Sequence, residues 1–224
     1  MIGIYCFSGS GHSMAVAQAL AGMLDCEVRP MGPGGREETA AVVFPVYCQN
    51  IPEPVKAFLK ELRAKHVALI ATYGKISYGN VLWEARKILR GQVIAGAYIP
   101  VGHTFLDGNA RFDERCLAPI AERLRTPRAA SIPRTRKNPL ADLAPGLRSR
   151  LGVRLIRDSR CDGCGACEKA CPMGAIRGGK AGPRCIRCLR CVTVCPVKAL
   201  TYRNSRVLDL YLKSYYKEEY VLYL

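Results

Sequence analysis

The segment CDGCGACEKACP at residues 161–172 returns as CIRCLRCVTVCP at residues 185–196. Each copy has the spacing C-x2-C-x2-C-x3-C-P. Proteins hold soft iron centres with thiolates, and this spacing is typical of bacterial segments that bind cubane [4Fe-4S] clusters. The duplication therefore predicts a small module with internal twofold pseudosymmetry and two clusters.

In this motif one short loop supplies three thiolates to a cluster, and the fourth cysteine of the run binds the cluster of the other run. The assignment is therefore crosswise. The first cluster is predicted to be held by Cys161, Cys164, Cys167 and Cys195, and the second by Cys185, Cys188, Cys191 and Cys171. Zinc is an alternative, although it rarely takes eight cysteines in this doubled spacing. Clusters with a purely structural role are another.

The charges around the two runs differ. Arg184, Arg187 and Arg190 lie among the second set of ligands, whereas Asp162 and Glu168 lie within the first. Nearby cations stabilise the reduced, more negative cluster. We therefore predict the higher reduction potential for the second cluster, unless the arginines point into solvent, where screening removes most of the effect.

The composition fits this chemistry. The chain has 224 residues, 12 cysteines, a formal net charge of +16 and a mean hydropathy of +0.01. It begins without a secretory leader, so we expect a cytoplasmic protein whose cysteines bind metal. No apolar run reaches the roughly 18 residues of a membrane span. Residues 126–224 hold 20 basic and 7 acidic residues, which predicts an acidic protein partner, with nucleic acid unlikely in the absence of interleaved aromatics.

Upstream of the repeat, apolar stretches alternate with amphipathic ones. Strand and helix in turn predict an α/β fold with a doubly wound parallel sheet of about five strands. Near the end of the chain, Leu208, Leu212 and Tyr215 share one helical face, so the tail is predicted to dock as a helix. The predicted parts are an α/β domain at 1–125, a basic Pro-rich linker at 126–157, a small α+β domain with two [4Fe-4S] clusters at 158–202 and a Tyr-rich tail at 203–224.

The first apolar stretch is followed by FSGSGHS at residues 7–13, which leads into an amphipathic stretch. Glycines let a loop turn its N–H groups inward, serines add hydroxyl donors, and a helix N-terminus favours anions. The segment is therefore a candidate phosphate site. It lacks the lysine of a Walker A loop and the glycine spacing of a dinucleotide fingerprint, which disfavours ATP and NAD. A tight turn without a ligand is the alternative.

Residues 4–20 resemble the phosphate loop of flavodoxins, with Ser13 in place of the usual Thr and His12 where Asn is common. His12 is either a neighbour of the phosphate or a solvent-exposed loop residue. The segments FPVYCQNIPEPVKAFL at 44–59 and ATYGKISYGNVLWEARKIL at 71–89 resemble the two flavin-flanking loops of flavodoxins. Taken with the doubled cysteine run, the chain resembles the flavodoxin/ferredoxin fusion family of anaerobic bacteria and archaea.

This resemblance implies a flavodoxin-like first domain that binds FMN. The implied phosphate ligands are Ser8, Gly9, Ser10, Gly11, His12 and Ser13. The implied ring neighbours are Val46, Tyr47, Cys48, Gln49 and Asn50 on one side and Tyr73, Gly74 and Tyr78 on the other. Tyr47, Tyr73 or Tyr78 is expected to stack on the ring.

The expected function is electron transfer between FMN and two [4Fe-4S] clusters, and onward to an acidic redox partner. One alternative is a flavin-dependent oxidoreductase that reduces a small acceptor with electrons from the clusters. Another is a ferredoxin whose flavodoxin-like domain is a scaffold without flavin. An electron carrier is expected over an enzyme with its own substrate, and no Ser-His-Asp or paired-carboxylate pattern supports hydrolysis.

Overall fold

A computed structural model describes residues 2–32, 34–105 and 112–224, and it divides into two compact units. Unit 1 comprises Met1–Pro139 together with Lys217–Leu224, and unit 2 comprises Leu140–Tyr216. The chain therefore leaves unit 1 and returns to it at its end. Within the described ranges, no helix has both the length and the apolar content needed to cross a bilayer.

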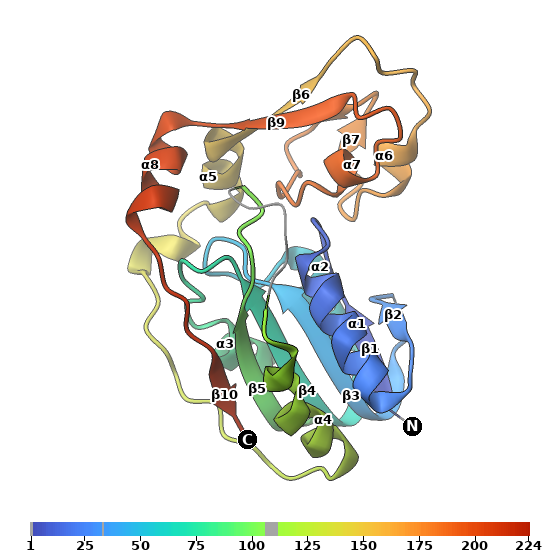
Figure 1. Cartoon of the computed structure of the whole chain (residues 1–224), viewed down its shortest axis with the longest axis vertical. Helices are drawn as coiled ribbons and strands as arrows, with labels where there is room; N and C mark the ends of the chain where they lie inside the picture. Colours follow the sequence, from blue (N-terminus) through green and yellow to red (C-terminus); the bar gives the residue numbers. More distant parts are fainter. Residues whose placement is uncertain (1, 33, 106–111) are drawn as a thin grey trace. The chain divides into compact units, whose positions relative to one another are not determined.

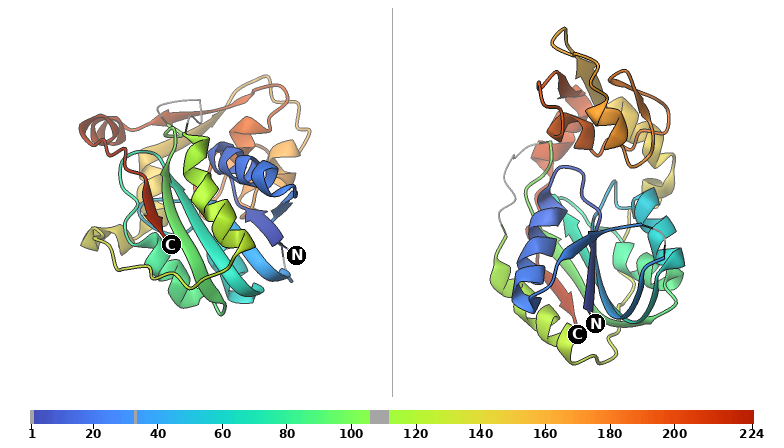
Figure 2. Two further views of the ribbon diagram at one scale, coloured as in Figure 1. Left: turned by 60° about the horizontal axis from the view of Figure 1, so that its bottom comes forward. Right: turned by 90° about the vertical axis from the view of Figure 1, so that its right-hand side faces the viewer.

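Unit 1 alternates strands and helices along the chain. Its elements are β1 (Ile2–Cys6), α1 (His12–Leu24), β2 (Val28–Pro30), β3 (Arg36–Pro45), α2 (Glu53–Glu61), β4 (Arg63–Tyr73), α3 (Val81–Ile88), β5 (Gln92–Pro100), η1 (Glu114–Leu117), α4 (Ala118–Arg125) and β10 (Val221–Tyr223). They form three layers, in which α1 and α4 cover one face of the sheet and α2 and α3 cover the other (Figures 1 and 2).

The sheet has the strand order β10-β5-β4-β3-β1-β2. Strands β1 to β5 are parallel to their neighbours, and this part of the order is that of a flavodoxin-like doubly wound sheet. The central strands β3 and β4 carry unbroken buried runs at 40–44 and 67–71. Helices on both faces require such continuous apolar runs, because a strand covered twice has no solvated side.

The sheet has six strands, whereas the sequence predicts five. The additional strand, β10, lies at the edge and pairs antiparallel with β5, with Leu222 opposite Ala97. A strand of three residues is too short to show a period, and its partner lies far away in the sequence. The sequence predicts a helical tail with Tyr215 on its docking face. The tail contains a helix, α8 (Arg206–Ser214), followed by a strand, and Tyr215 lies just beyond the end of the helix.

Unit 2 is a small α+β unit built around the cysteine repeat. Its elements are η2 (Pro139–Asp142), α5 (Pro145–Gly152), β6 (Val153–Arg157), α6 (Ala166–Lys169), β7 (Ile176–Arg177), β8 (Lys180–Ala181), α7 (Arg190–Thr193), β9 (Leu200–Asn204) and α8. Strands β6 and β9 form an antiparallel ribbon. The one-turn helices α6 and α7 occupy equivalent places in the two repeats, and left-handed residues, Gly165 and Leu189, precede them.

The C-terminal segment at 217–219 forms hydrogen bonds and an ion pair with the end of β4 and the loop that follows it. The hydroxyl of Tyr73 donates to the carbonyl oxygen of Glu219 at 2.5 Å and accepts the N–H of the same residue at 2.8 Å. Lys75 forms an ion pair with Glu218 at 2.7 Å. Because Tyr73 is only 2% exposed, the loss of its hydroxyl would leave two backbone groups without their partner.

We expect Tyr73→Phe to lower the free energy of unfolding of unit 1 by about 1–3 kcal/mol. Tyr78→Phe is the matched control, because the Tyr78 hydroxyl meets half-exposed side chains of Lys217 and Glu219 and should cost less than about 1 kcal/mol. Urea unfolding can be followed by the fluorescence of Trp83, the single tryptophan. Equal losses for the two variants would contradict the assigned role of Tyr73.

Candidate functional site

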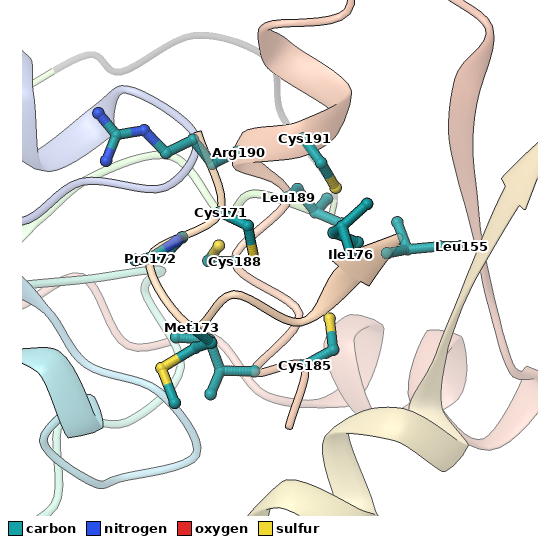
Figure 3. A pocket seen from close by; sticks show the side chains of 11 residues that line it. Leu155, Cys171, Pro172, Met173, Ile176, Cys185, Cys188, Leu189, Arg190 and Cys191 are labelled. Carbon is teal, nitrogen blue, oxygen red and sulfur yellow. The ribbon is translucent and has the colours of Figure 1, made fainter. Parts of the chain in front are cut away.

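Unit 2 contains two cavities, each lined by four cysteines. The first is lined by Cys161, Cys164, Cys167 and Cys195. The second is lined by Cys171, Cys185, Cys188 and Cys191, with Leu155 and Ile176 beside them (Figure 3). Each cavity thus collects three thiols from one repeat and the fourth from the other. We call them the Cys161 site and the Cys185 site.

The two fourth cysteines have equivalent surroundings. The Cys171 sulfur accepts the N–H of Ala175 at 3.2 Å, and the Cys195 sulfur accepts the N–H of Ala199 at 3.3 Å. Prolines that follow each cysteine turn the chain, so that the amide four residues later returns to the sulfur. Among the residues that the structure describes, no three Cys, His, Asp or Glu side chains group as ligands of a single metal ion.

The two sites differ in burial. Cys185, Cys188 and Cys191 are all less than a tenth exposed, whereas Cys164 at the other site is exposed. Burial raises the pKa of Cys188 to about 11 and that of Cys191 to about 12. Iron binds thiolates, so the binding of a cluster at the Cys185 site would be coupled to the loss of thiol protons.

The charges around the two sites also differ. Arg187 is half-buried, its Nε donates to the carbonyl oxygen of Val153 at 2.8 Å, and its Nη1 is buried with no hydrogen-bond partner among the described residues. Arg184 is exposed, and the Arg190 guanidinium points away from the sulfurs in Figure 3. At the Cys161 site, the Asp162 carboxylate accepts the Cys164 N–H.

Burial and charge act on the potential of the Cys185 site in opposite directions. Desolvation disfavours the reduced, more negative cluster, whereas the arginines favour it. For scale, two unit charges about 10 Å apart at an effective dielectric constant of about 20 interact by about 1.7 kcal/mol, or roughly 70 mV for a one-electron couple. Arg187 lies partly out of solvent, so screening removes less of this contribution. We therefore expect the higher reduction potential at the Cys185 site.

We expect Arg187→Gln to lower the potential of the Cys185 cluster by roughly 50–80 mV, as measured by potentiometric EPR. Arg184→Gln is the control from the same loop, and its exposed charge should shift the potential by less than about 20 mV. Clusters that titrate together in the native protein, or equal shifts in the two variants, would contradict this prediction.

In unit 1, the loop between β1 and α1 lies where the strands end. Gly11, with φ +100°, is the N-cap of α1, which has no side-chain cap and no acidic residue in its first turn. The N–H groups of that turn, with their partial positive charge, are suited to an anion. Ser8 Oγ accepts the Gly11 N–H at 3.1 Å, and Ser13 Oγ is hydrogen-bonded to Thr72 at 2.8 Å.

His12 is the first residue of α1 and is 7% exposed, so the expectation of a solvent-exposed loop residue is wrong. Its Nδ1 lies 3.1 Å from the hydroxyl of Ser10, which also bonds to the hydroxyl of Thr104 at 2.9 Å. The ring packs inward because it opens a helix whose next turn is in the core. Together with Gly9 and Gly11, these residues form a compact loop around the N-terminus of α1.

The loop after β3 is a tight two-residue turn. Tyr47 and Asn50 exchange two backbone hydrogen bonds, of 3.0 and 2.8 Å. Between them, Cys48 and Gln49 have φ of +51° and +63°, a left-handed conformation that costs L-residues roughly 1–2 kcal/mol each. Val46 donates its N–H to Thr72 at 2.8 Å. Such strain is often found in ligand-binding loops.

The loop after β4 differs from the sequence expectation. Tyr73 is buried beneath the tail, and Tyr78 stacks on Tyr98 with ring centroids 4.0 Å apart. The Lys217 ammonium lies 4.5 Å from the Tyr78 ring. Tyr73 and Tyr78, two of the three tyrosines expected to offer a ring to a flavin, thus make their contacts within the chain. At Gly74, an added Cβ would lie 2.3 Å from the ring of His103, so only glycine fits there.

Sequence reasoning missed several partners in these loops. Thr72 and Thr104 supply the hydroxyls that meet the serines of the first loop, and Lys217 and Glu219 hold the loop after β4. Threonine at the end of an apolar strand is a sequence signal for Thr72, whereas Thr104 lies four residues beyond the end of β5. No local signal marks the second pair, because its partners lie at the other end of the chain.

Comparisons with known proteins assign part of unit 2. The family model for the 4Fe-4S binding domain matches residues 155–177 and 184–201. No curated protein matches the chain. A solved candidate flavoprotein from Bacteroides eggerthii DSM 20697 is 16% identical, with a TM-score of 0.39, over 56% of this chain and 98% of its own. The Trp repressor binding protein from Bacillus subtilis is 12% identical, with a TM-score of 0.37, over 57% and 99%.

Proposed function

We propose that this protein transfers electrons through two [4Fe-4S] clusters, one at the Cys161 site and one at the Cys185 site. The observation that carries the proposal is the grouping of eight thiols into two cavities, each with three cysteines from one repeat and one from the other. The match of the 4Fe-4S binding domain to the same segments supports it. Each cluster supplies one-electron chemistry.

We further propose that unit 1 binds FMN at the carboxyl ends of its strands. The open N-terminus of α1 and the Gly/Ser loop before it support a phosphate site, and the strained turn at Cys48 and Gln49 supports a neighbouring ligand. The ring would then lie against Val46, Tyr47 and Asn50 rather than between tyrosines. A bound flavin supplies two-electron chemistry that complements the single-electron steps of the clusters.

A second candidate is a ferredoxin whose unit 1 serves as a scaffold without flavin. The contacts of Tyr73 and Tyr78 favour it, because neither ring is available to stack on a ligand. The two candidates differ in flavin content, which can be measured directly.

Anaerobic purification followed by iron, sulfide and flavin counts is the test. Electron transfer with FMN predicts about eight iron, about eight sulfide and one flavin per chain. Full iron with no flavin, even after addition of FMN, would favour the scaffold. Protein that stays colourless and iron-free after reconstitution would overturn both.

We also propose that the redox partner is an acidic protein. Fifteen basic and five acidic residues lie between 140 and 216, and two oxidised clusters of charge about −2 each leave unit 2 positive. Complementary charge accelerates docking, and salt screens it. Stopped-flow reduction of an acidic carrier protein should slow as ionic strength rises, and a rate independent of salt would exclude this partner class.

A further inference from the structure

Helix α5 buries no residue within the part of the chain that the structure describes. Leu147 and Leu151 lie one turn apart on its surface and are 49% and 72% exposed. Leu143, which precedes the N-cap Ala144, is 67% exposed but lies outside the helix. A helix of eight residues is marginal in water and normally depends on packing of its apolar face. The apolar stripe of α5 therefore lacks the cover that such a helix needs.

Helix α8 has a second exposed stripe. Its inner face is held by Leu212, which is buried, whereas Val207 and Leu210 are 78% and 67% exposed. Tyr211, next to Leu210 on the helix surface, is also exposed. The spacing of three and four residues places these side chains on one face of the helix. Thus α8 is apolar on the side away from unit 2 as well as on the side toward it.

The two helices are neighbours within unit 2 (Figure 1). Ser205, the N-cap of α8, donates its N–H to the carbonyl oxygen of Gly152 at the end of α5, at 2.8 Å. A Cβ added at Gly152 would lie 3.3 Å from Leu208 of α8. We call the two stripes together the α5/α8 surface, defined by Leu147, Leu151, Val207, Leu210 and Tyr211.

Exposed basic residues lie in and next to the two helices of the α5/α8 surface. Arg148 and Arg154 lie in or next to α5, and Arg206 and Lys213 lie in α8. The acidic Asp209 accepts a hydrogen bond from Asn204 at 2.9 Å. A second copy of the chain would bring the same positive charges together, which opposes self-association through this surface. An apolar stripe with a cationic border is the pattern of segments that lie on anionic bilayers.

We propose that the α5/α8 surface docks on an anionic membrane, with Leu147, Leu151, Val207 and Leu210 at the acyl boundary and the neighbouring arginines at lipid phosphates. Protruding aliphatic side chains enter a bilayer without a matching shape, whereas a protein partner must supply one. Tyrosine is enriched at the membrane interface, which suits Tyr211. This proposal is independent of which cofactors unit 1 binds.

Cluster-loaded full-length protein should float with vesicles of phosphatidylglycerol and phosphatidylcholine mixed about 1:1, and not with phosphatidylcholine alone. Leu147→Ser combined with Leu210→Ser should reduce the bound fraction at least tenfold. Leu224→Ser, at an exposed leucine of unit 1, is the control and should bind as the native protein does. The visible absorption of the clusters reports that each variant is folded.

The flotation results distinguish docking on a membrane from self-association and from non-specific adsorption. Flotation that falls with added salt and is lost in the double variant supports the proposal. No flotation overturns it, as does a concentration-dependent dimer without vesicle binding, which would assign the surface to a second copy. Flotation that the double variant retains also overturns it, because the basic chain would then adsorb through another face. If the double variant loses its cluster absorption, and so its fold, the single variant Val207→Ser replaces it in the test. The proposal then requires that Val207→Ser weakens binding to the vesicles.

Discussion

Replacing Cys171 and Cys188 together by alanine is expected to leave about four irons per chain, whereas replacing Cys171 and Cys164 together leaves almost none. The reason is the crosswise grouping: Cys171 and Cys188 line one cavity, while Cys164 lines the other. The first pair therefore removes two ligands from one cluster, and the second pair damages both. Iron and sulfide counts after anaerobic reconstitution measure the difference.

The reverse result would show that each run holds its own cluster. In that case Cys171 and Cys164 would share a cluster, and their double variant would be the one that retains about four irons. Cys195 provides the symmetry-related control, since its replacement together with Cys164 should also spare one cluster. Cys48, exposed and outside both cavities, supplies a cysteine variant that should keep all the iron.

Removal of iron is expected to unfold unit 2 and leave unit 1 folded. The buried core of unit 2 is a small cluster of Ile176, Cys191 and Leu200, with Leu155 and Val192 packed against it together with other thiols of the two sites. A core of this size is below what an independent domain needs, so the clusters must supply the remaining stability. Unit 1 has a separate and much larger core.

Hydrogen exchange after anaerobic chelation measures this prediction. Amides of β6 and β9 should lose their protection, while those of β3 and β4 in the centre of the unit 1 sheet should keep it. The same unit 1 amides in the iron-loaded protein are the internal control. If the amides of β6 and β9 remain protected after the loss of iron, unit 2 folds without its clusters. The clusters would then be bound groups that do not contribute to the stability of the fold.

The structure contains contacts and one strand that the sequence alone did not predict. Tyr47, Tyr73 or Tyr78 was expected to stack on a flavin. The hydroxyls of Tyr73 and Tyr78 bond to Glu219 and Lys217, about 140 positions later, and no local sequence pattern predicts these contacts. His12 was expected in solvent as one possibility, but it opens a helix and turns inward. The sixth strand, β10, is too short to predict from its own residues.

The pattern of α1, the parallel strands β1 to β5 and the cysteine runs was determined by the sequence itself, because apolar period and ligand spacing are properties of a dozen neighbouring residues. Which side chains face which cavity is not such a property. Only the tertiary structure decided that Arg184 is exposed whereas Arg187 is half-buried, that the tail returns to complete the sheet of unit 1, and that the neighbouring helices α5 and α8 both leave apolar side chains exposed. These features depend on contacts between segments that are far apart in the sequence, and such contacts form only when the chain folds.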